Sequence, residues 1–183
     1  MTLEQYKELK SKASFEGFYV GLLWLFSFAA FVMQFSIPNL SLISMGSAAV
    51  SVVLVIVRLR RHRNEHLDEL PYFKAFMYSL LVFFYASLVM ALGQWLYFQY
   101  IDQGFLMQSY IKQLESPEFK ELMKGVSDLK PEDVKLMLEE VGELRAIDIA
   151  MQFLSTNIVI SVVLSMITAF FSAGKATLPL AKR

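Results

Sequence analysis

The two histidines of the chain lie in a pattern that zinc enzymes use. Residues 62–66 read His-Arg-Asn-Glu-His, which matches H-x-x-E-H, the motif of inverted zinc metallopeptidases. On a helix, two histidines four residues apart share one face, so His62 and His66 could bind zinc while Glu65 acts as the base. A zinc peptidase is therefore one hypothesis for this chain.

The surroundings of this motif favour a different interpretation. Four arginines put positive charge next to the position where a zinc ion would bind: Arg58, Arg60, Arg61 and Arg63. The candidate third ligands fall in a loop that the topology below puts on the opposite side of a membrane: Glu139, Glu140 and Glu143. We therefore expect no catalytic residues, no metal and no cofactor. The arginines are typical of a basic cluster that faces anionic lipid and sets orientation.

Several side-chain amides fall within apolar stretches, and four of them are candidates for a role inside a bundle: Gln34, Gln94, Gln152 and Asn157. If the stretches are antiparallel membrane helices, Gln94 and Asn157 lie at matching depths, about two turns inside the outer boundary. They could line an outward-opening pocket for a small polar ligand. They could instead form interhelical hydrogen bonds, each contributing about 0.6–2 kcal/mol, and we expect this second role.

The composition excludes several classes of protein. Hydrophobic residues make up 56% of the chain and charged residues 19%, against about 25% charged residues in a typical soluble domain. The absence of cysteine excludes disulfides and cysteine-ligated metal sites. A formal net charge of 0 gives no general attraction to nucleic acid, so we expect no nucleic-acid partner.

Three long stretches contain no Asp, Glu, Lys or Arg: residues 17–57, 75–101 and 149–174. About 20 helical residues cross a hydrocarbon core of about 30 Å. The first stretch is long enough to cross twice, and Ser36-Ile37-Pro38-Asn39 supplies a turn at its middle. The sequence predicts one all-α membrane domain over residues 1–183, a four-helix bundle with spans at about 16–36, 39–57, 73–101 and 149–174.

The distribution of basic residues predicts the orientation. The segments 1–16, 58–74 and 175–183 together carry 11 basic and 6 acidic residues, whereas the loop 102–148 carries 6 basic and 11 acidic residues. Lys and Arg concentrate in cytoplasmic loops. We expect both termini in the cytoplasm of an inner membrane and the loop 102–148 on the extracytoplasmic side.

The loop 102–148 has helical rather than linker character. Apolar residues continue at helical spacing after the third span, Ser116-Pro117-Glu118 reads as a helix start, and Lys130-Pro131-Glu132-Asp133 starts another helix. We see no helix breaker before the fourth span. The pattern predicts that the third and fourth helices extend beyond the bilayer into an extracytoplasmic helical cap.

Small residues at spacing four predict close helix contacts. Gly17 and Gly21 form a GxxxG pattern in the first span. The fourth span carries a small-residue stripe of four members: Ser161, Ser165, Ala169 and Ala173. Small side chains let membrane helices approach closely. We expect the stripe to face another helix, within the bundle or in a second copy.

Several sequence features follow one another in a recognisable order. After the first helical hairpin come the basic stretch Arg58–Arg63, the aromatic lead-in Pro71-Tyr72-Phe73-Lys74-Ala75-Phe76, and the segment Tyr100-Ile101-Asp102-Gln103-Gly104-Phe105. In this layout nearly the whole chain resembles a family of small bacterial membrane proteins, the domain of unknown function numbered four thousand one hundred ninety-nine. The resemblance implies a four-helix inner-membrane protein and no established activity.

These observations favour a non-enzymatic scaffold or accessory subunit. Its partners would be the lipid bilayer and a second copy or another membrane protein. The alternatives are an oligomeric transport or permeation component that uses the Gln94 and Asn157 region, and the zinc peptidase at residues 62–66.

Overall fold

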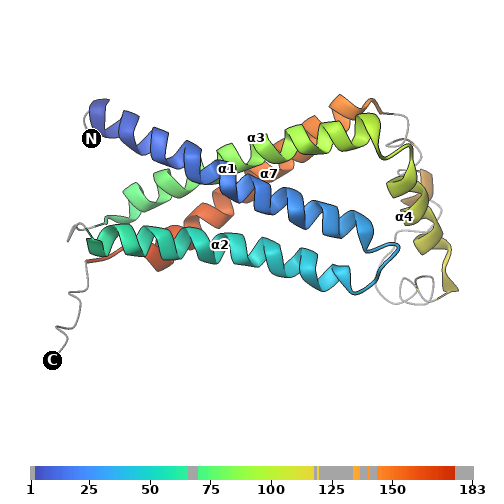
Figure 1. Ribbon diagram of the computed structural model, residues 1–183, viewed down its shortest axis with the longest axis horizontal. Helices are drawn as coiled ribbons and strands as arrows, with labels where there is room; N and C mark the ends of the chain where they lie inside the picture. The colour runs from blue at the N-terminus through green and yellow to red at the C-terminus, as the bar shows by residue number, and fades with distance from the viewer. Residues whose placement is uncertain are drawn as a thin grey trace. The chain divides into compact units, whose positions relative to one another are not determined.

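The computed structural model describes residues 3–65, 70–117, 119, 134–136, 140 and 144–175. Its helices are α1 (Leu3–Met33), α2 (Leu40–Glu65), α3 (Tyr72–Tyr100), α4 (Phe105–Glu115) and α7 (Ala146–Ser172) (Figure 1). Four of them, α1, α2, α3 and α7, are long and apolar enough to cross a membrane. The predicted all-α fold with four spans is confirmed, and the chain is a multi-pass membrane protein.

Two of the helices run well beyond the charge-free stretches. α1 begins at Leu3, and α2 continues to Glu65. Lys, Arg and Glu are good helix formers, so a helix need not end where charge begins. Between α1 and α2 the turn lies where Pro38 predicts it, and the Met33 carbonyl accepts the Ile37 N–H at 2.9 Å.

The chain divides into two compact units, which we describe separately. The bundle unit comprises Met1–Ala91 and Leu154–Arg183, and the cap unit comprises Leu92–Phe153. The bundle unit therefore holds α1, α2, most of α3 and most of α7. The cap unit holds the last turns of α3, all of α4 and the first turns of α7.

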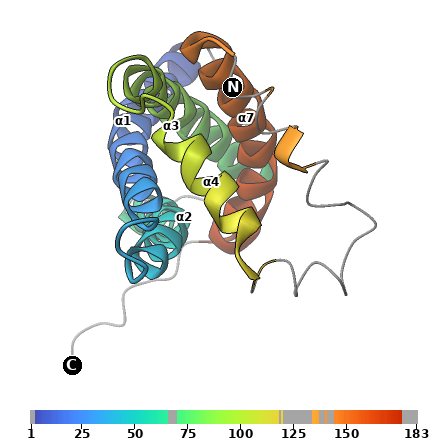
Figure 2. The same ribbon diagram turned by 90° about the vertical axis from the view of Figure 1, so that its right-hand side faces the viewer.

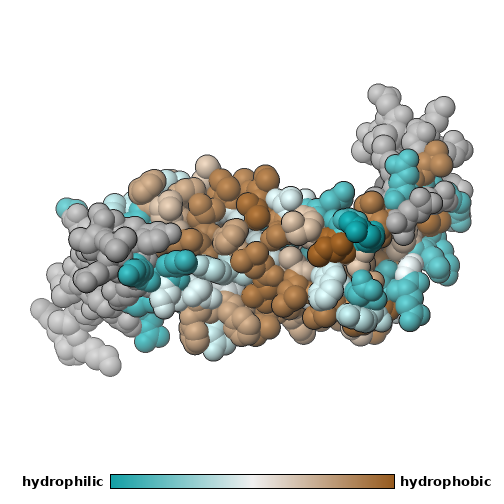
Figure 3. Space-filling view, turned by 90° about the horizontal axis from the view of Figure 1, so that it is seen from above, coloured by the Kyte–Doolittle hydropathy of each residue, from teal (hydrophilic) through white to brown (hydrophobic). Residues whose placement is uncertain are grey.

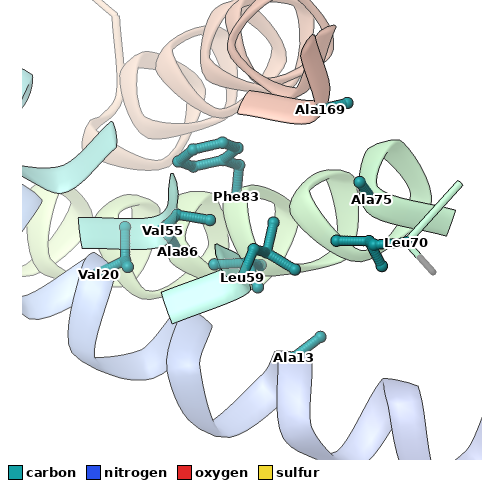
Figure 4. Close-up of a cluster of buried hydrophobic side chains, with 10 residues drawn as sticks. Ala13, Val20, Val55, Leu59, Leu70, Ala75, Phe83, Ala86 and Ala169 are labelled. Carbon is teal, nitrogen blue, oxygen red and sulfur yellow. The ribbon is translucent and has the colours of Figure 1, made fainter. Parts of the chain in front are cut away.

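The core of the bundle unit is built mostly from small and medium-sized apolar side chains around Phe83, and Figure 4 shows them on different helices. Against this cluster packs Trp24 of α1, which stacks on Phe83 of α3 with ring centroids 6.0 Å apart and planes 9° apart. The Trp24 Nε1–H also donates a hydrogen bond of 2.9 Å to Ser51 Oγ of α2. One aromatic side chain thus joins three helices.

The outward faces of the spans are apolar. Figure 3 shows hydrophobic residues gathered along the middle of the helices. In the α2 span 12% of the most apolar window is buried, against 39% in the α1 span. α2 therefore presents most of its apolar surface outward, as a lipid-facing helix does.

In the cap unit the chain turns sharply after α3, where we expected the helix to continue. α3 ends at Tyr100, and Gln103 (φ 43°) and Gly104 (φ 83°) have left-handed backbone conformations. The buried Asp102 fixes this turn: its carboxylate accepts N–H bonds from Gly104 at 3.1 Å and Leu106 at 3.0 Å. Asp102 thereby satisfies the first amides of α4, a separate helix of the cap (Figure 2).

α7 also starts with a break that the sequence analysis did not foresee. Leu144 and Arg145 are not helical. The Arg145 carbonyl accepts the N–H groups of Asp148 at 2.9 Å and Ile149 at 3.2 Å. Its guanidinium forms a bidentate pair with the Asp148 carboxylate at 2.7 and 3.0 Å, which raises the pKa of Arg145. The helices expected over residues 117–144 fall largely outside the described residues.

Candidate functional site

The GxxxG pattern of α1 lies directly against α3. A Cβ atom built on Gly17 would lie 2.6 Å from Tyr85 Cβ and 2.7 Å from the Val82 carbonyl oxygen. One built on Gly21 would lie 2.6 Å from Val89 Cβ. These separations are shorter than any ordinary contact, so both positions require glycine for the backbones to approach this closely.

The small-residue stripe of α7 lies inside the bundle unit. Ser161, Ser165 and Ala169 are fully buried, and Ala173 is half-buried. The Ser161 hydroxyl lies 3.3 Å from the Ser87 hydroxyl of α3. The stripe therefore faces a helix of the same chain, one of the two arrangements that the sequence left open.

Sequence analysis missed how many hydroxyl groups share this interior. Besides Ser161 and Ser165, α7 buries Thr168 and Ser172, and α3 buries Ser79 and Ser87. The α7 set recurs at positions i, i+4, i+7 and i+11, which is one face of a helix. A search for hydroxyls at that spacing would have found the set, whereas we considered only spacing four.

The four amides lie in different environments. Gln34 and Asn157 are half-buried, and Gln152 is exposed. Gln94 is 2% exposed, and its Oε1 atom has no hydrogen-bond partner among the described residues. Gln94 belongs to the cap unit and Asn157 to the bundle unit, so their pairing stays a prediction.

Two residues of the arginine cluster cap the end of α7. Arg60 Nε donates to the Phe171 carbonyl at 2.7 Å, and Arg63 Nη1 donates to the Ser172 carbonyl at 3.0 Å. The last carbonyls of a helix lack intrahelical partners and carry partial negative charge, so guanidinium groups stabilise them. Beside them Leu70 and Gly174 exchange two backbone hydrogen bonds of 3.1 and 3.0 Å.

The other two arginines have separate surroundings. Arg58 Nη1 lies 3.6 Å from Glu16 Oε1, and Tyr78 of α3 also interacts with the Glu16 carboxylate. This cluster joins α1, α2 and α3 at the end of the bundle unit where α7 finishes. Arg61 is exposed. The basic cluster thus has structural contacts to helix ends in addition to the lipid-facing role that its sequence predicts.

The H-x-x-E-H motif is only partly described. His62 and Glu65 belong to the last turns of α2, and His66 lies outside the described residues. Within the described ranges, no group of three or more His, Asp or Glu residues is placed to hold a metal ion.

One comparison with known proteins gives a match. A family model described as "Protein of unknown function (DUF4199)" matches residues 16–173, which include most of all four spans. No curated protein and no solved structure matches the chain.

Proposed function

This chain belongs to the DUF4199 family of proteins of unknown function, and we propose that it acts without catalysis, as a scaffold or accessory subunit of a membrane assembly. The contact of Gly17 and Gly21 with α3 carries this proposal. The helices there are already closer than an added methyl group would allow. A bundle packed in this way is a rigid support whose outward faces remain available for lipid or protein.

The fixed end of α7 supports the same proposal. Arg60 and Arg63 of α2 hold its last carbonyls, and Leu70 pairs with Gly174 just beyond. Each of these contacts joins segments far apart in the sequence. They restrain the relative motion of α2, α3 and α7, which suits a structural role.

The orientation that we propose places both termini in the cytoplasm of a bacterial inner membrane. It rests on the basic residues of the segments 1–16, 58–74 and 175–183. Because the chain has no cysteine, single cysteines report topology directly. We expect Gly125→Cys to react with an impermeant maleimide in intact spheroplasts and Asn64→Cys to react only after lysis. The opposite labelling pattern would refute this orientation.

The functional proposal is tested on protein purified in mild detergent from its native membrane. We expect a second membrane protein at a fixed molar ratio that persists after crosslinking in intact cells. Binding of one zinc per chain, lost in His66→Ala, would instead support the peptidase. A chain that is recovered alone in every detergent and after crosslinking would refute the scaffold.

A permeation component is the second candidate, because the side-chain oxygen of Gln94, Oε1, lacks a hydrogen-bond partner among the described residues. A buried amide oxygen inside a membrane helix is unfavourable unless a polar group or solute reaches it. Solute flux into liposomes that weakens in Gln94→Leu would support this candidate. Liposomes no leakier than protein-free ones would refute it.

A further inference from the structure

Two hydroxyl groups in the bundle unit are buried and unsatisfied. Thr168 and Ser172 are both 0% exposed, and neither Thr168 Oγ1 nor Ser172 Oγ has a hydrogen-bond partner among the described residues. Their neighbours on α7 behave differently: Ser161 and Ser165 donate to the carbonyls one turn earlier at 2.6 Å. That backward bond is the ordinary one for a helical hydroxyl. A hydroxyl that is buried without it needs another partner.

The position of the two hydroxyls follows from the pairing of α3 with α7. The helices are antiparallel, since Ser87 contacts Ser161 and Leu70 pairs with Gly174. Ser79 lies about two turns from Ser87 along α3, and Thr168 lies about two turns from Ser161 along α7. Hydroxyl groups from both helices therefore lie between the Ser87–Ser161 contact and the Leu70–Gly174 pair, and Ser79 is fully buried.

The residues of α3 and α7 at the depth of Thr168 and Ser172 include alanines, whose side chains take up little space. Ala75 of α3 and Ala169 of α7 are both 0% exposed. Ser79 donates its own hydroxyl to the Ala75 carbonyl at 2.9 Å, which leaves its oxygen able to accept a further hydrogen bond. Acceptors and donors are therefore both present for a small polar guest.

The charges nearby select a neutral guest. Arg63 donates to the Ser172 carbonyl at 3.0 Å, so its positive charge and the negative end of the α7 dipole offset each other beside the site. This leaves little net charge to hold either a cation or an anion. Water carries no charge, both donates and accepts hydrogen bonds, and commonly satisfies buried polar groups.

We propose that buried water occupies the α3–α7 interface at the depth of Thr168 and Ser172, and that it supplies the hydrogen bonds these hydroxyls lack. This goes beyond the scaffold function, because it gives the bundle a hydrated interior on the cytoplasmic side of the Ser87–Ser161 contact. The water is held between that contact and the Leu70–Gly174 pair.

Water-edited solid-state NMR on the full chain in phosphatidylcholine vesicles tests this. It measures how fast magnetisation passes from water to each side chain. We expect transfer to Thr168 and Ser172 to be as fast as to the exposed Ser11, and much slower transfer to Val55, which is 1% exposed in the core. Transfer to Thr168 as slow as to Val55 would overturn the proposal.

A matched pair of variants gives an independent readout. Thr168→Val removes the hydroxyl without changing side-chain size, and Thr156→Val makes the same change at an exposed position of α7. If water is bound, we expect Thr168→Val to lower the melting temperature by about 2–4 °C and Thr156→Val to leave it unchanged or raised. A dry site would show the reverse, because losing an unsatisfied hydroxyl stabilises a protein. Should Thr168→Val fail to fold, the transfer rate in the unaltered chain decides.

Discussion

Gly17→Ala tests whether the bundle depends on the contact between α1 and α3. The added methyl group would lie 2.6 Å from Tyr85 Cβ and 2.7 Å from the Val82 carbonyl oxygen, where ordinary contact begins at 3.4 Å. A backbone oxygen cannot rotate away, so α1 must move off α3. Overpacking of this kind costs about 1–3 kcal/mol, and the better helix propensity of alanine offsets up to about 1 kcal/mol. We expect a net destabilisation of about 1–2 kcal/mol.

The assay is reversible unfolding in mixed micelles, followed by helicity and by the fluorescence of the two tryptophans, of which Trp24 stacks on Phe83. Gly46→Ala is the matched control, because nothing lies within 4 Å of a Cβ atom at that position. The control should show only the propensity gain and become slightly more stable. Equal stabilisation of Gly17→Ala and Gly46→Ala would refute the close contact.

Three further experiments test other contacts. Arg63→Met should cost about 1–2 kcal/mol and speed hydrogen exchange just beyond α7, because it removes charged donors from the final carbonyls. Tyr97→Phe should cost about 1–2 kcal/mol and speed exchange in the first turn of α4, since its hydroxyl donates to Asp102 at 2.7 Å. Trp24→Phe and Ser51→Ala should show a coupling energy of at least about 0.5 kcal/mol in a double-mutant cycle of micelle unfolding.

Exposed positions provide controls for the first two of these substitutions. Lys74→Met removes a cation from an exposed position of α3, and Tyr100→Phe removes a hydroxyl from a side chain that is 67% exposed. Both should change stability by less than about 0.5 kcal/mol. Losses as large as those of Arg63→Met and Tyr97→Phe would contradict the capping roles. Strictly additive losses for Trp24 and Ser51 would contradict their hydrogen bond.

The number and type of the spans were predictable because hydrocarbon imposes a simple rule. A backbone in lipid must satisfy its own hydrogen bonds, so a long charge-free stretch becomes a helix. The turn at Pro38 was predictable for a similarly local reason, since proline restricts the residue before it. Helix ends were less predictable, because lysine, arginine and glutamate continue a helix as well as they end a membrane span.

Contacts between distant segments could not be predicted from local patterns. Asp102 looked like one polar residue after a span, and its capping of α4 depends on Gly104 adopting a left-handed conformation. Arg60 and Arg63 were assigned a role toward lipid because their partners, the carbonyls of α7, are backbone groups more than a hundred positions away. Backbone acceptors leave no signal in the residue types of a sequence.

The order of the helices along the chain determines when the contacts of α7 can form during synthesis. α7 leaves the ribosome after α1, α2 and α3, so α3 first enters lipid while Ser87 lacks its contact with Ser161. At that stage Arg60 and Arg63 of α2 lack the carbonyls that they later bind. An intermediate with α1, α2 and α3 alone is therefore more polar on one face than the complete bundle. The packing of α7 then covers that face.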